Sequence, residues 1–218
     1  MIKCIIFDFD GVILESVDVK TKAFKALFSK YPQKVDEIIK FHLDNGGMSR
    51  FDKFRYIYKN ILKKELNAEE FNKLCRKFSK LVLEKVISSS FVKGIKDFLD
   101  IYKSQYAMFI ISATPDKEIK FIVRRKSINK YFSGVFGSPM TKVDSIKEIL
   151  RQRRYKPQEV VFIGDSHNDL KAAKHTKVFF IARKTGNHAV WLKNKGIRAK
   201  IKDFSNKNKI LGLLNSLK

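Results

Sequence analysis

The chain begins with an apolar run that ends in two aspartates and a glycine. Residues 2–7 are Ile-Lys-Cys-Ile-Ile-Phe, and their β-branched and aromatic side chains predict a buried strand. Asp8 and Asp10 come directly after this run, and Gly11 is next. Buried carboxylates are costly unless something pairs with them, and two neighbouring carboxylates repel each other. The stretch therefore indicates either a cation site at the carboxyl edge of a parallel sheet or a solvated turn, where Asp and Gly are common.

After residue 90, apolar strand-like runs alternate with segments of helical spacing. Such alternation indicates a parallel sheet whose connections are helical and right-handed. We therefore expect an α/β fold with a Rossmann-like parallel sheet flanked by helices. The expected strands cover residues 106–111, 134–136, 160–163 and 178–181, and the expected helices cover residues 93–102, 115–126, 143–153, 169–175, 188–193 and 204–217.

Between the first strand and residue 90 the pattern is different. Apolar residues recur there at helical spacing, and no strand-like run is present. Asn45-Gly46-Gly47 separates two of these helical segments, and Asn67 would cap another that has an acidic first turn. We expect an all-helical cap domain over residues 16–90, inserted into a core domain formed by residues 1–15 and 91–218.

The composition favours a soluble protein of a reducing compartment. Hydrophobic residues make up 44% of the chain, which is enough for a sizeable core. The two cysteines, Cys4 and Cys75, form neither a disulfide framework nor a metal-ligand spacing. No signal peptide or membrane-spanning run is apparent. We expect a cytoplasmic protein.

The chain is also strongly basic. It has 46 Lys and Arg residues against 22 Asp and Glu residues, a formal net charge of +24. Such a charge can indicate a nucleic-acid partner, but the lysines are spread over the whole chain and no recognition motif stands out. We favour an enzyme of anionic substrates with a lysine-rich surface, and expect neither a nucleic-acid nor a membrane partner. The sequence leaves the oligomeric state open.

Three further polar stretches follow expected strands or begin expected helices. Ser112 follows a strand, where a hydroxyl and free backbone amides suit an anion, although an ordinary helix cap uses the same residues. Asp165 and Asp169 form a second acidic pair, which could cap a helix or share one Mg²⁺ ion with the first pair. Lys142 would open a helix, where a cation opposes the helix dipole. If Lys142 points inward, it could balance the carboxylates and a bound phosphate.

These stretches resemble, in order, the four motifs of the haloacid dehalogenase superfamily. Asp-x-Asp-Gly-Val at residues 8–12 and Gly-Asp-Ser-x-x-Asp at residues 164–169 form a specific combination. Ser112-Ala113-Thr114 and Lys142 match the second and third motifs, which are weak signals alone. The helical insert resembles the cap of the subfamily that contains phosphoglycolate phosphatase and β-phosphoglucomutase.

The resemblance implies a Mg²⁺-dependent phosphatase of a small phosphorylated metabolite, such as a sugar phosphate or a phosphoglycolate-like ester. Asp8 would be the nucleophile that forms an aspartyl-phosphate, and Asp10 would be the general acid and then the general base. The implied metal ligands are Asp8, the backbone carbonyl of Asp10, Asp165 and, in or near the shell, Asp169. The residues implied to hold the phosphoryl group are Gly11, Ser112, Ala113 and Lys142.

Two departures from related families bear on the reaction. Haloacid dehalogenases proper lack the second aspartate, so Asp10 argues against dehalogenation and for phosphoryl transfer. β-Phosphoglucomutases carry a Glu-Asp pair in the fourth motif, whereas this chain has Gly164-Asp165. A phosphomutase remains the alternative enzyme. The alternative of another class is a basic, nucleic-acid-associated or regulatory binding protein whose phosphatase site is idle.

The cap offers candidate substrate residues around its glycine-rich turn. The stretch Gly-Gly-Met-Ser-Arg at residues 46–50 resembles a cap element of the β-phosphoglucomutase group in which the arginine binds an anionic group of the substrate. We therefore expect Arg50 and Lys53 to contact the leaving group, although a surface loop with exposed cations would give the same pattern. Glu15, Ser16 and Asp18 could also line the entrance or serve only as linker residues. We expect no catalytic role for His42, His167, His175 and His188, because they share no spacing.

Overall fold

The computed structural model describes residues 1–185 and 190–217. Its centre is a six-stranded sheet in which all neighbouring strands are parallel, in the order β3-β2-β1-β4-β5-β6. The expected α/β fold with a parallel sheet is confirmed. The strands are β1 (Cys4–Phe7), β2 (Ala107–Pro115), β3 (Gly134–Ser138), β4 (Val160–Gly164), β5 (Phe179–Arg183) and β6 (Ala199–Ile201).

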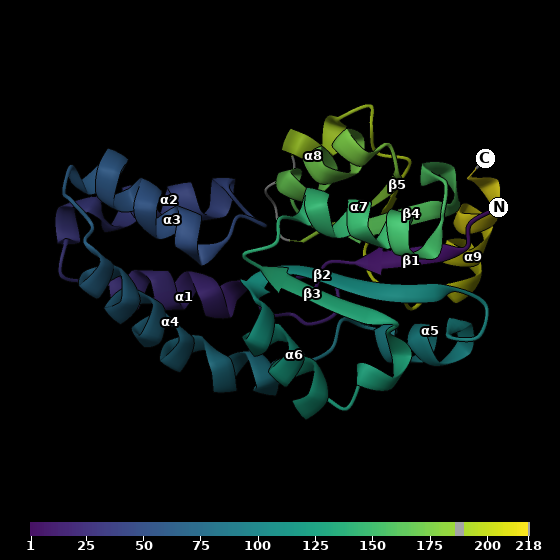
Figure 1. Ribbon diagram of the computed structural model, residues 1–218, viewed down its shortest axis with the longest axis horizontal. Coiled ribbons are helices and arrows are strands. Elements are labelled where there is room, and N and C mark those ends of the chain that lie inside the picture. Colours follow the sequence, from purple (N-terminus) through teal and green to yellow (C-terminus); the bar gives the residue numbers. More distant parts are fainter. Residues whose placement is uncertain (186–189, 218) are drawn as a thin grey trace.

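Helices cover both faces of this sheet (Figure 1). Side chains alternate along a strand, so Ile5 and Phe7 of β1 pack into one hydrophobic cluster while Cys4 and Ile6 pack into the other. All four side chains are fully buried, which explains why β1 has no polar position. The first cluster includes α5 (Ile95–Tyr102), α6 (Asp116–Arg125) and α9 (Lys207–Ser216), and the second includes α7 (Lys142–Arg153) and α8 (His167–Thr176).

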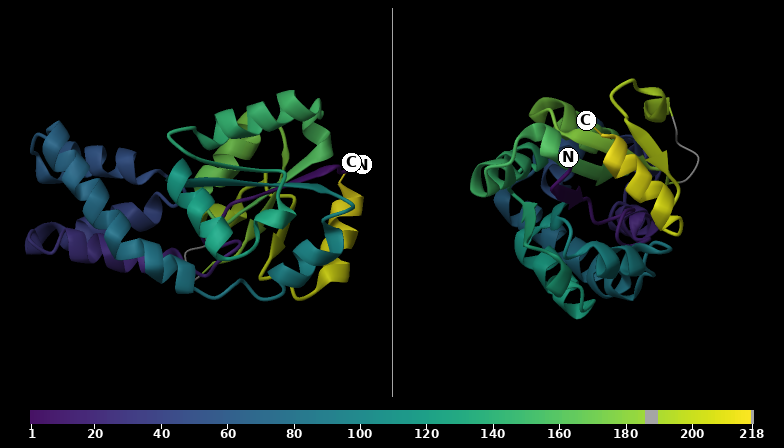
Figure 2. Two further views of the ribbon diagram at one scale, coloured as in Figure 1. Left: turned by 60° about the horizontal axis from the view of Figure 1, so that its bottom comes forward. Right: turned by 90° about the vertical axis from the view of Figure 1, so that its right-hand side faces the viewer.

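The segment between β1 and α5 forms a helical cap at one end of the molecule, opposite the two termini (Figures 1 and 2). Its centre is aromatic: the ring centroids of Phe24 and Phe78 lie 4.9 Å apart, and those of Phe28 and Phe54 lie 6.2 Å apart. The phenylalanines at helical spacing are therefore core residues of the cap. The cap helices are α1 (Val17–Leu27), α2 (Val35–Asp44), α3 (Arg50–Tyr56), which continues as a π-helical turn (Ile57–Leu62), and α4 (Ala68–Ser88).

The two connections between cap and core run side by side. Leu14 and Phe91 form an antiparallel bridge, and the Glu15 amide donates to the Ser90 carbonyl at 3.0 Å. We keep residues 15–16 and 90–91 as the proposed boundaries of the cap, since the chain leaves the core and returns to it there.

Several elements differ from the sequence-based expectation. β2 extends to Pro115, because Pro115 pairs with Ser138 of β3 after a register shift, so the second motif lies inside the strand. α8 begins at His167, two residues early, because Ser166 and Asp169 form a reciprocal capping box. The three-residue strand β6 was not predicted, since so short an edge strand has little apolar pattern. Of the helix expected over residues 188–193, the described part is a 3₁₀ turn (Val190–Lys193), and residues 188–189 lie outside the described residues.

Two expectations from composition concern cysteines and membranes. Cys4 lies buried in β1 and Cys75 half-buried on α4, and both are free thiols. Among the described residues, no helix combines the length and the apolar character that a bilayer-spanning helix needs.

Candidate active site

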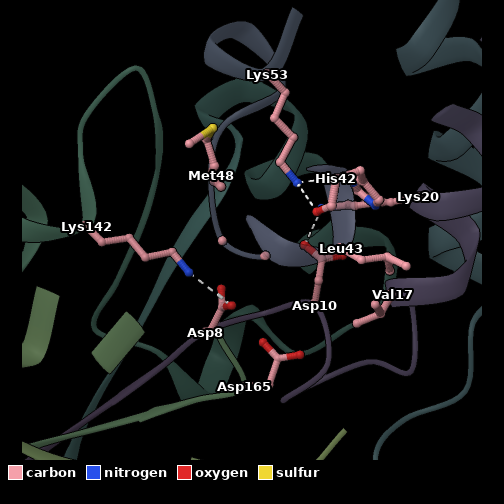
Figure 3. A pocket seen from close by; sticks show the side chains of 13 residues that line it. Asp8, Asp10, Val17, Lys20, His42, Leu43, Met48, Lys53, Lys142 and Asp165 are labelled. Carbon is pink, nitrogen blue, oxygen red and sulfur yellow. Dashed lines mark hydrogen bonds and ion pairs between the residues drawn. The ribbon is translucent and has the colours of Figure 1, made fainter. Parts of the chain in front are cut away.

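The carboxyl ends of the central strands meet beneath the cap. Asp8 follows β1 and Asp165 follows β4, and the register of these strands places Phe7 beside Ile163. The Asp8 amide donates to the Ile163 carbonyl at 2.9 Å, which fixes the two strand ends together. A cavity of about 100 Å³ lies in front of them and is lined by residues of both core and cap (Figure 3). This is the edge of the sheet where open α/β folds bind ligands.

Three carboxylates crowd together at this edge. One oxygen from each of Asp8, Asp165 and Asp169 lies within 4.8 Å of the others. Burial, and then the neighbouring carboxylates Asp169 and Asp10, raise the pKa of Asp8 to about 7 despite the opposing charge of Lys142. Burial followed by the charges of Asp8 and Asp169 also raises the pKa of Asp165 well above its ordinary value. The cluster therefore holds more negative charge than its protein neighbours balance.

Gly11 allows this crowding. Its φ is +78°, a backbone conformation that favours glycine. A Cβ added there would lie 2.1 Å from Oδ2 of Asp165. Any other residue at this position would displace either the turn or the carboxylate.

Lys142 is the cation inside the acidic cluster. Its Nζ lies 3.0 Å from Oδ2 of Asp8 and donates to Oδ1 of Asp169, and its side chain is 9% exposed. Although burial opposes it, the charges of Asp169 and Asp8 raise the pKa of Lys142 above its ordinary value. Thr141 caps α7 by accepting from the Asp144 amide, which offsets the unfavourable position of a cation in the first turn. Lys142 therefore stays charged beside Asp8.

The carboxylate cluster fits a hard divalent cation. All of its donors are oxygens, which such cations prefer, and three carboxylate oxygens within 4.8 Å of one another favour a bound positive charge. Asp169 is within reach of the same ion, but both of its oxygens already accept hydrogen bonds, from Lys142 and from Ser166. Asp8 and Asp165 could thus hold the cation, with Asp169 orienting Lys142 at their side.

The end of β2 lies beside this cluster. Ser112 is buried, and its Oγ accepts from the Thr114 amide at 3.1 Å. Ala113 lines the cavity together with Asp8 and Lys142. Ala113 of the second motif and Lys142 of the third thus line the same cavity as Asp8.

The side chain of Asp10 points away from the acidic cluster and toward the cap (Figure 3). Its Oδ1 accepts from Ser16 Oγ at 2.6 Å, and its Oδ2 accepts from Lys20 Nζ. Although burial acts in the opposite direction, Lys20 and Ser16 lower the pKa of Asp10 below its ordinary value. Asp8 and Asp10, two residues apart, therefore differ in charge environment and in direction.

Lys53 reaches the cavity from the cap. Its Nζ donates to the His42 carbonyl at 3.0 Å and lies 2.9 Å from His42 Nδ1. Burial, and then the charges of Lys20 and Lys142, lower the pKa of Lys53 to about 7. Within residues 1–185 and 190–217 no carboxylate pairs with this ammonium. Lys53 is thus available to an anionic group in the cavity.

Arg50 lies deeper between cap and core. Its guanidinium donates to Ser79 of α4 and to Glu118 of α6, and its side chain is 5% exposed. It also stacks over the Phe78 ring at 4.8 Å. The structure directs Arg50 toward a core carboxylate rather than toward the Asp8 edge of the cavity.

Comparison with known proteins gives the family. The sequence profile described as haloacid dehalogenase-like hydrolase matches residues 5–183, which include all four motifs. The chain belongs to the haloacid dehalogenase-like hydrolase family. It is accordingly an enzyme, and the expected family and enzyme class are confirmed.

Curated relatives of this family member are phosphatases. Phosphoglycolate phosphatase 1 of Pseudomonas aeruginosa is 23% identical over 178 residues, which are 79% of this chain and 65% of that protein. A phosphorylated carbohydrates phosphatase of Thermotoga maritima is 24% identical over 178 residues, 79% of this chain and 80% of that protein. The fold is similar to the crystal structure of a predicted phosphoglycolate phosphatase from Haemophilus somnus, with a TM-score of 0.77, 20% identity, and coverage of 96% of this chain and 98% of that one.

The linker residues of this hydrolase have distinct surroundings. Glu15 is paired with Arg183 through both carboxylate oxygens, and Arg183 also donates to the Gly11 carbonyl at 2.8 Å. Ser16 is buried against Asp10, whereas Asp18 is exposed. Glu15 thus fixes the motif turn to β5, and Ser16 alone of these three contacts the site.

Sequence reasoning missed two residues beside Asp10 and Lys53. Lys20 binds Asp10 and Thr114, but in so basic a chain one lysine on a helix gives no signal. His42, for which we expected no catalytic role, lines the cavity against Lys53. Its neighbours come from the packing of α2 on α3, which no motif spacing contains. His167 and His175 lie on α8, and His188 lies outside the described residues.

Proposed function

We propose that the protein is a Mg²⁺-dependent phosphatase that hydrolyses a small phosphorylated metabolite through an aspartyl-phosphate on Asp8. The substrates that we favour are a sugar phosphate or a phosphoglycolate-like monoester. The names of the relatives from Pseudomonas aeruginosa and Thermotoga maritima support this class.

One observation carries the proposal: the two motif aspartates are held in different ways. Asp8 lies in the acidic cluster 3.0 Å from Lys142, where a cation can bind and a phosphoryl group can be attacked. Asp10 is directed to the cap side, where the leaving group of a substrate would lie. A nucleophile and a proton-transfer group need this division of positions.

In the first step, an Asp8 oxygen attacks phosphorus and the bond between phosphorus and the leaving oxygen breaks. Because Lys20 and Ser16 favour the ionised form of Asp10, Asp10 would take up a proton as the anionic substrate binds beside it. It then gives that proton to the leaving oxygen, so the product departs as an alcohol. Lys142, the Ser112 hydroxyl, and the backbone of Gly11 and Ala113 would bind the phosphoryl oxygens during the transfer.

In the second step, Asp10 takes a proton from a water molecule, which attacks the phosphorus of the aspartyl-phosphate. The bond between Asp8 and phosphorus breaks, and phosphate and a free Asp8 carboxylate result. A Mg²⁺ ion held by Asp8, the Asp10 carbonyl and Asp165, with Asp169 near, would neutralise the repulsion between the carboxylate and the phosphate.

The cap residues Lys53 and Arg50 would bind the leaving group and so select the substrate. Lys53 is buried at the cavity without a carboxylate partner among the described residues, so an anionic or hydroxyl-bearing leaving group would gain a charge-assisted hydrogen bond there. For Arg50 to contact substrate as well, its pair with Glu118 has to open. A cavity of about 100 Å³ suits a small leaving group.

A panel of phosphorylated metabolites, assayed for phosphate release with Mg²⁺ and with EDTA, tests the proposal. We expect Mg²⁺-dependent release from a small monoester and its loss in Asp8→Asn. Asp36→Asn, an exposed aspartate on α2, is the matched control and should keep full activity.

Two outcomes would contradict the proposal. Isomerisation of a β-sugar phosphate in the presence of its bisphosphate, without free phosphate, would make the protein a phosphomutase. Salt-dependent binding of RNA or DNA, together with no hydrolysis of any ester in the panel, would make it a binding protein.

A further inference from the structure

Lys20 is a cap residue whose ammonium reaches the proton-transfer group of the core. It lies in the first turns of α1, and its Nζ donates to Oδ2 of Asp10 and, at 2.9 Å, to Oγ1 of Thr114. The Lys20 side chain is 19% exposed and that of Asp10 is 14% exposed, so water screens this contact little. Figure 3 shows both residues at the cap side of the cavity, away from Asp165.

The hydrogen bonds that hold the Asp10 carboxylate come from one face of the cap helix α1. Ser16 precedes α1 and Lys20 follows it by four residues, which places both side chains on the same side of the helix. Ser16 holds Oδ1 of Asp10 and Lys20 holds Oδ2. Thr114, at the end of β2, fixes the lysine from the core side. Both carboxylate oxygens of Asp10 are therefore oriented by the first residues of the cap.

We propose that Lys20 is a positioning residue for Asp10. When α1 packs against the core, Lys20 orients the Asp10 carboxylate for proton transfer. This inference rests on the proposed function, in which Asp10 transfers protons. A general acid has to lie within hydrogen-bond distance of the leaving oxygen. The cap holds the Asp10 carboxylate through Ser16 and Lys20, whereas the core contact from Thr114 Oγ1 to Oδ2 is longer, at 3.4 Å. The cap thus completes the catalytic core as well as covering it.

Leaving groups distinguish this role from a merely structural one. An alkyl phosphate needs a proton on its leaving oxygen, whereas p-nitrophenyl phosphate does not. In single-turnover experiments, Lys20→Met should slow the first step of the best alkyl phosphate of the panel by about a hundredfold, the order expected when a catalytic group is displaced by about 1 Å. The first step of p-nitrophenyl phosphate should stay within a few-fold of wild type, with KM little changed for both esters.

Three further variants complete the test. Lys20→Arg keeps the charged donor and should recover most of the lost rate. Lys22→Met changes an exposed lysine of the same helix and should behave as wild type. In an Asp10→Asn background, Lys20→Met should cause no further loss on the alkyl phosphate, because the residue it orients is already gone.

The possible failures are distinguishable. A wild-type protein that hydrolyses no ester would overturn the proposed function and this inference with it. If the wild type is active, two results would overturn the positioning role alone. One is an equal loss of first-step rate with both esters in Lys20→Met, and the other is a change confined to KM. Additive losses in the Asp10→Asn background would also overturn it.

Discussion

At the residue scale, the site separates two aspartates that look alike in the sequence. Asp8 is crowded by carboxylates and has a raised pKa, whereas Asp10 is paired with Lys20 and has a lowered one. The position of both could be predicted, because a charged pair at the end of a buried strand needs a partner. Their different environments could not be predicted, because Lys20 and Ser16 contact Asp10 only through the packing of α1 against the core.

Gly11 gives a prediction at the same scale. Gly11→Ala adds a methyl group that would overlap Asp165 in a turn with φ +78°, so we expect at least a tenfold loss of Mg²⁺-dependent turnover and weaker Mg²⁺ binding. Titration of activity against Mg²⁺ concentration measures both. Gly212→Ala on α9, where the new methyl group meets nothing within 4 Å, should keep wild-type activity and raise stability by about 0.5–1 kcal/mol. Unchanged Mg²⁺ dependence in Gly11→Ala would show that the turn does not shape the metal site.

At the scale of elements, polar contacts join the cap to the core. Those around the cavity include Lys20 with Asp10 and Thr114, Arg50 with Glu118, and the Asn168 side chain with the Gly46 carbonyl. Gly47 lets the cap turn approach this closely, since a Cβ there would lie 2.6 Å from Ser166 Oγ. The closed arrangement is thus held by polar contacts around the cavity.

The pair of Arg50 and Glu118 leads to a stability prediction. Glu118→Gln leaves the buried guanidinium of Arg50 without its counter-charge, so we expect a loss of about 3–5 kcal/mol in the free energy of unfolding. Urea unfolding measures it. Glu148→Gln breaks an exposed pair with Arg151 on α7 and should change little. If both variants change the free energy of unfolding by equal, small amounts, the pair of Arg50 and Glu118 does not contribute to stability.

Sequence patterns predicted the elements better than their contacts. The alternation of apolar runs located β1, β4 and β5 because central parallel strands are apolar throughout. The same sequence patterns did not predict β6, and they ended β2 too early, because the last residues of β2 are held by pairing with β3. The contact of Arg50 with the substrate stays a prediction. Its pairing with Glu118 comes from the arrangement of α3 and α6, which the spacing within the motif does not encode.

At the scale of the whole molecule, the proposed metal site would link pH to stability. Asp8 has a raised pKa, about 7 against an ordinary value of 3.8, so its contribution to stability is complete below about pH 4 and is lost as the pH rises through 7. A cation bound by the ionised carboxylates should reverse this loss. Protons compete with the metal in acid, so Mg²⁺ should stabilise the protein most above pH 7.

We therefore expect Mg²⁺ to raise the melting temperature clearly at pH 8 and hardly at pH 5. At a Mg²⁺ concentration of about 100 times the dissociation constant, the gain corresponds to about 2.7 kcal/mol. Thermal unfolding with Mg²⁺ or EDTA measures it, and Asp165→Asn should abolish the difference while Asp36→Asn keeps it. A shift of the same size at both pH values would place Mg²⁺ outside the carboxylate cluster.

The central claim is that Asp8 carries the phosphoryl group. The most direct measurement uses the Asp10→Asn variant, in which p-nitrophenol can leave without a proton but the second step lacks its base. The variant is mixed with p-nitrophenyl phosphate and Mg²⁺, quenched in acid, and its peptides are analysed by mass spectrometry. The account predicts one phosphoryl group on Asp8, in the peptide that contains the first motif. A phosphoryl group on any other residue, or continued hydrolysis with no phosphorylated protein, would contradict it.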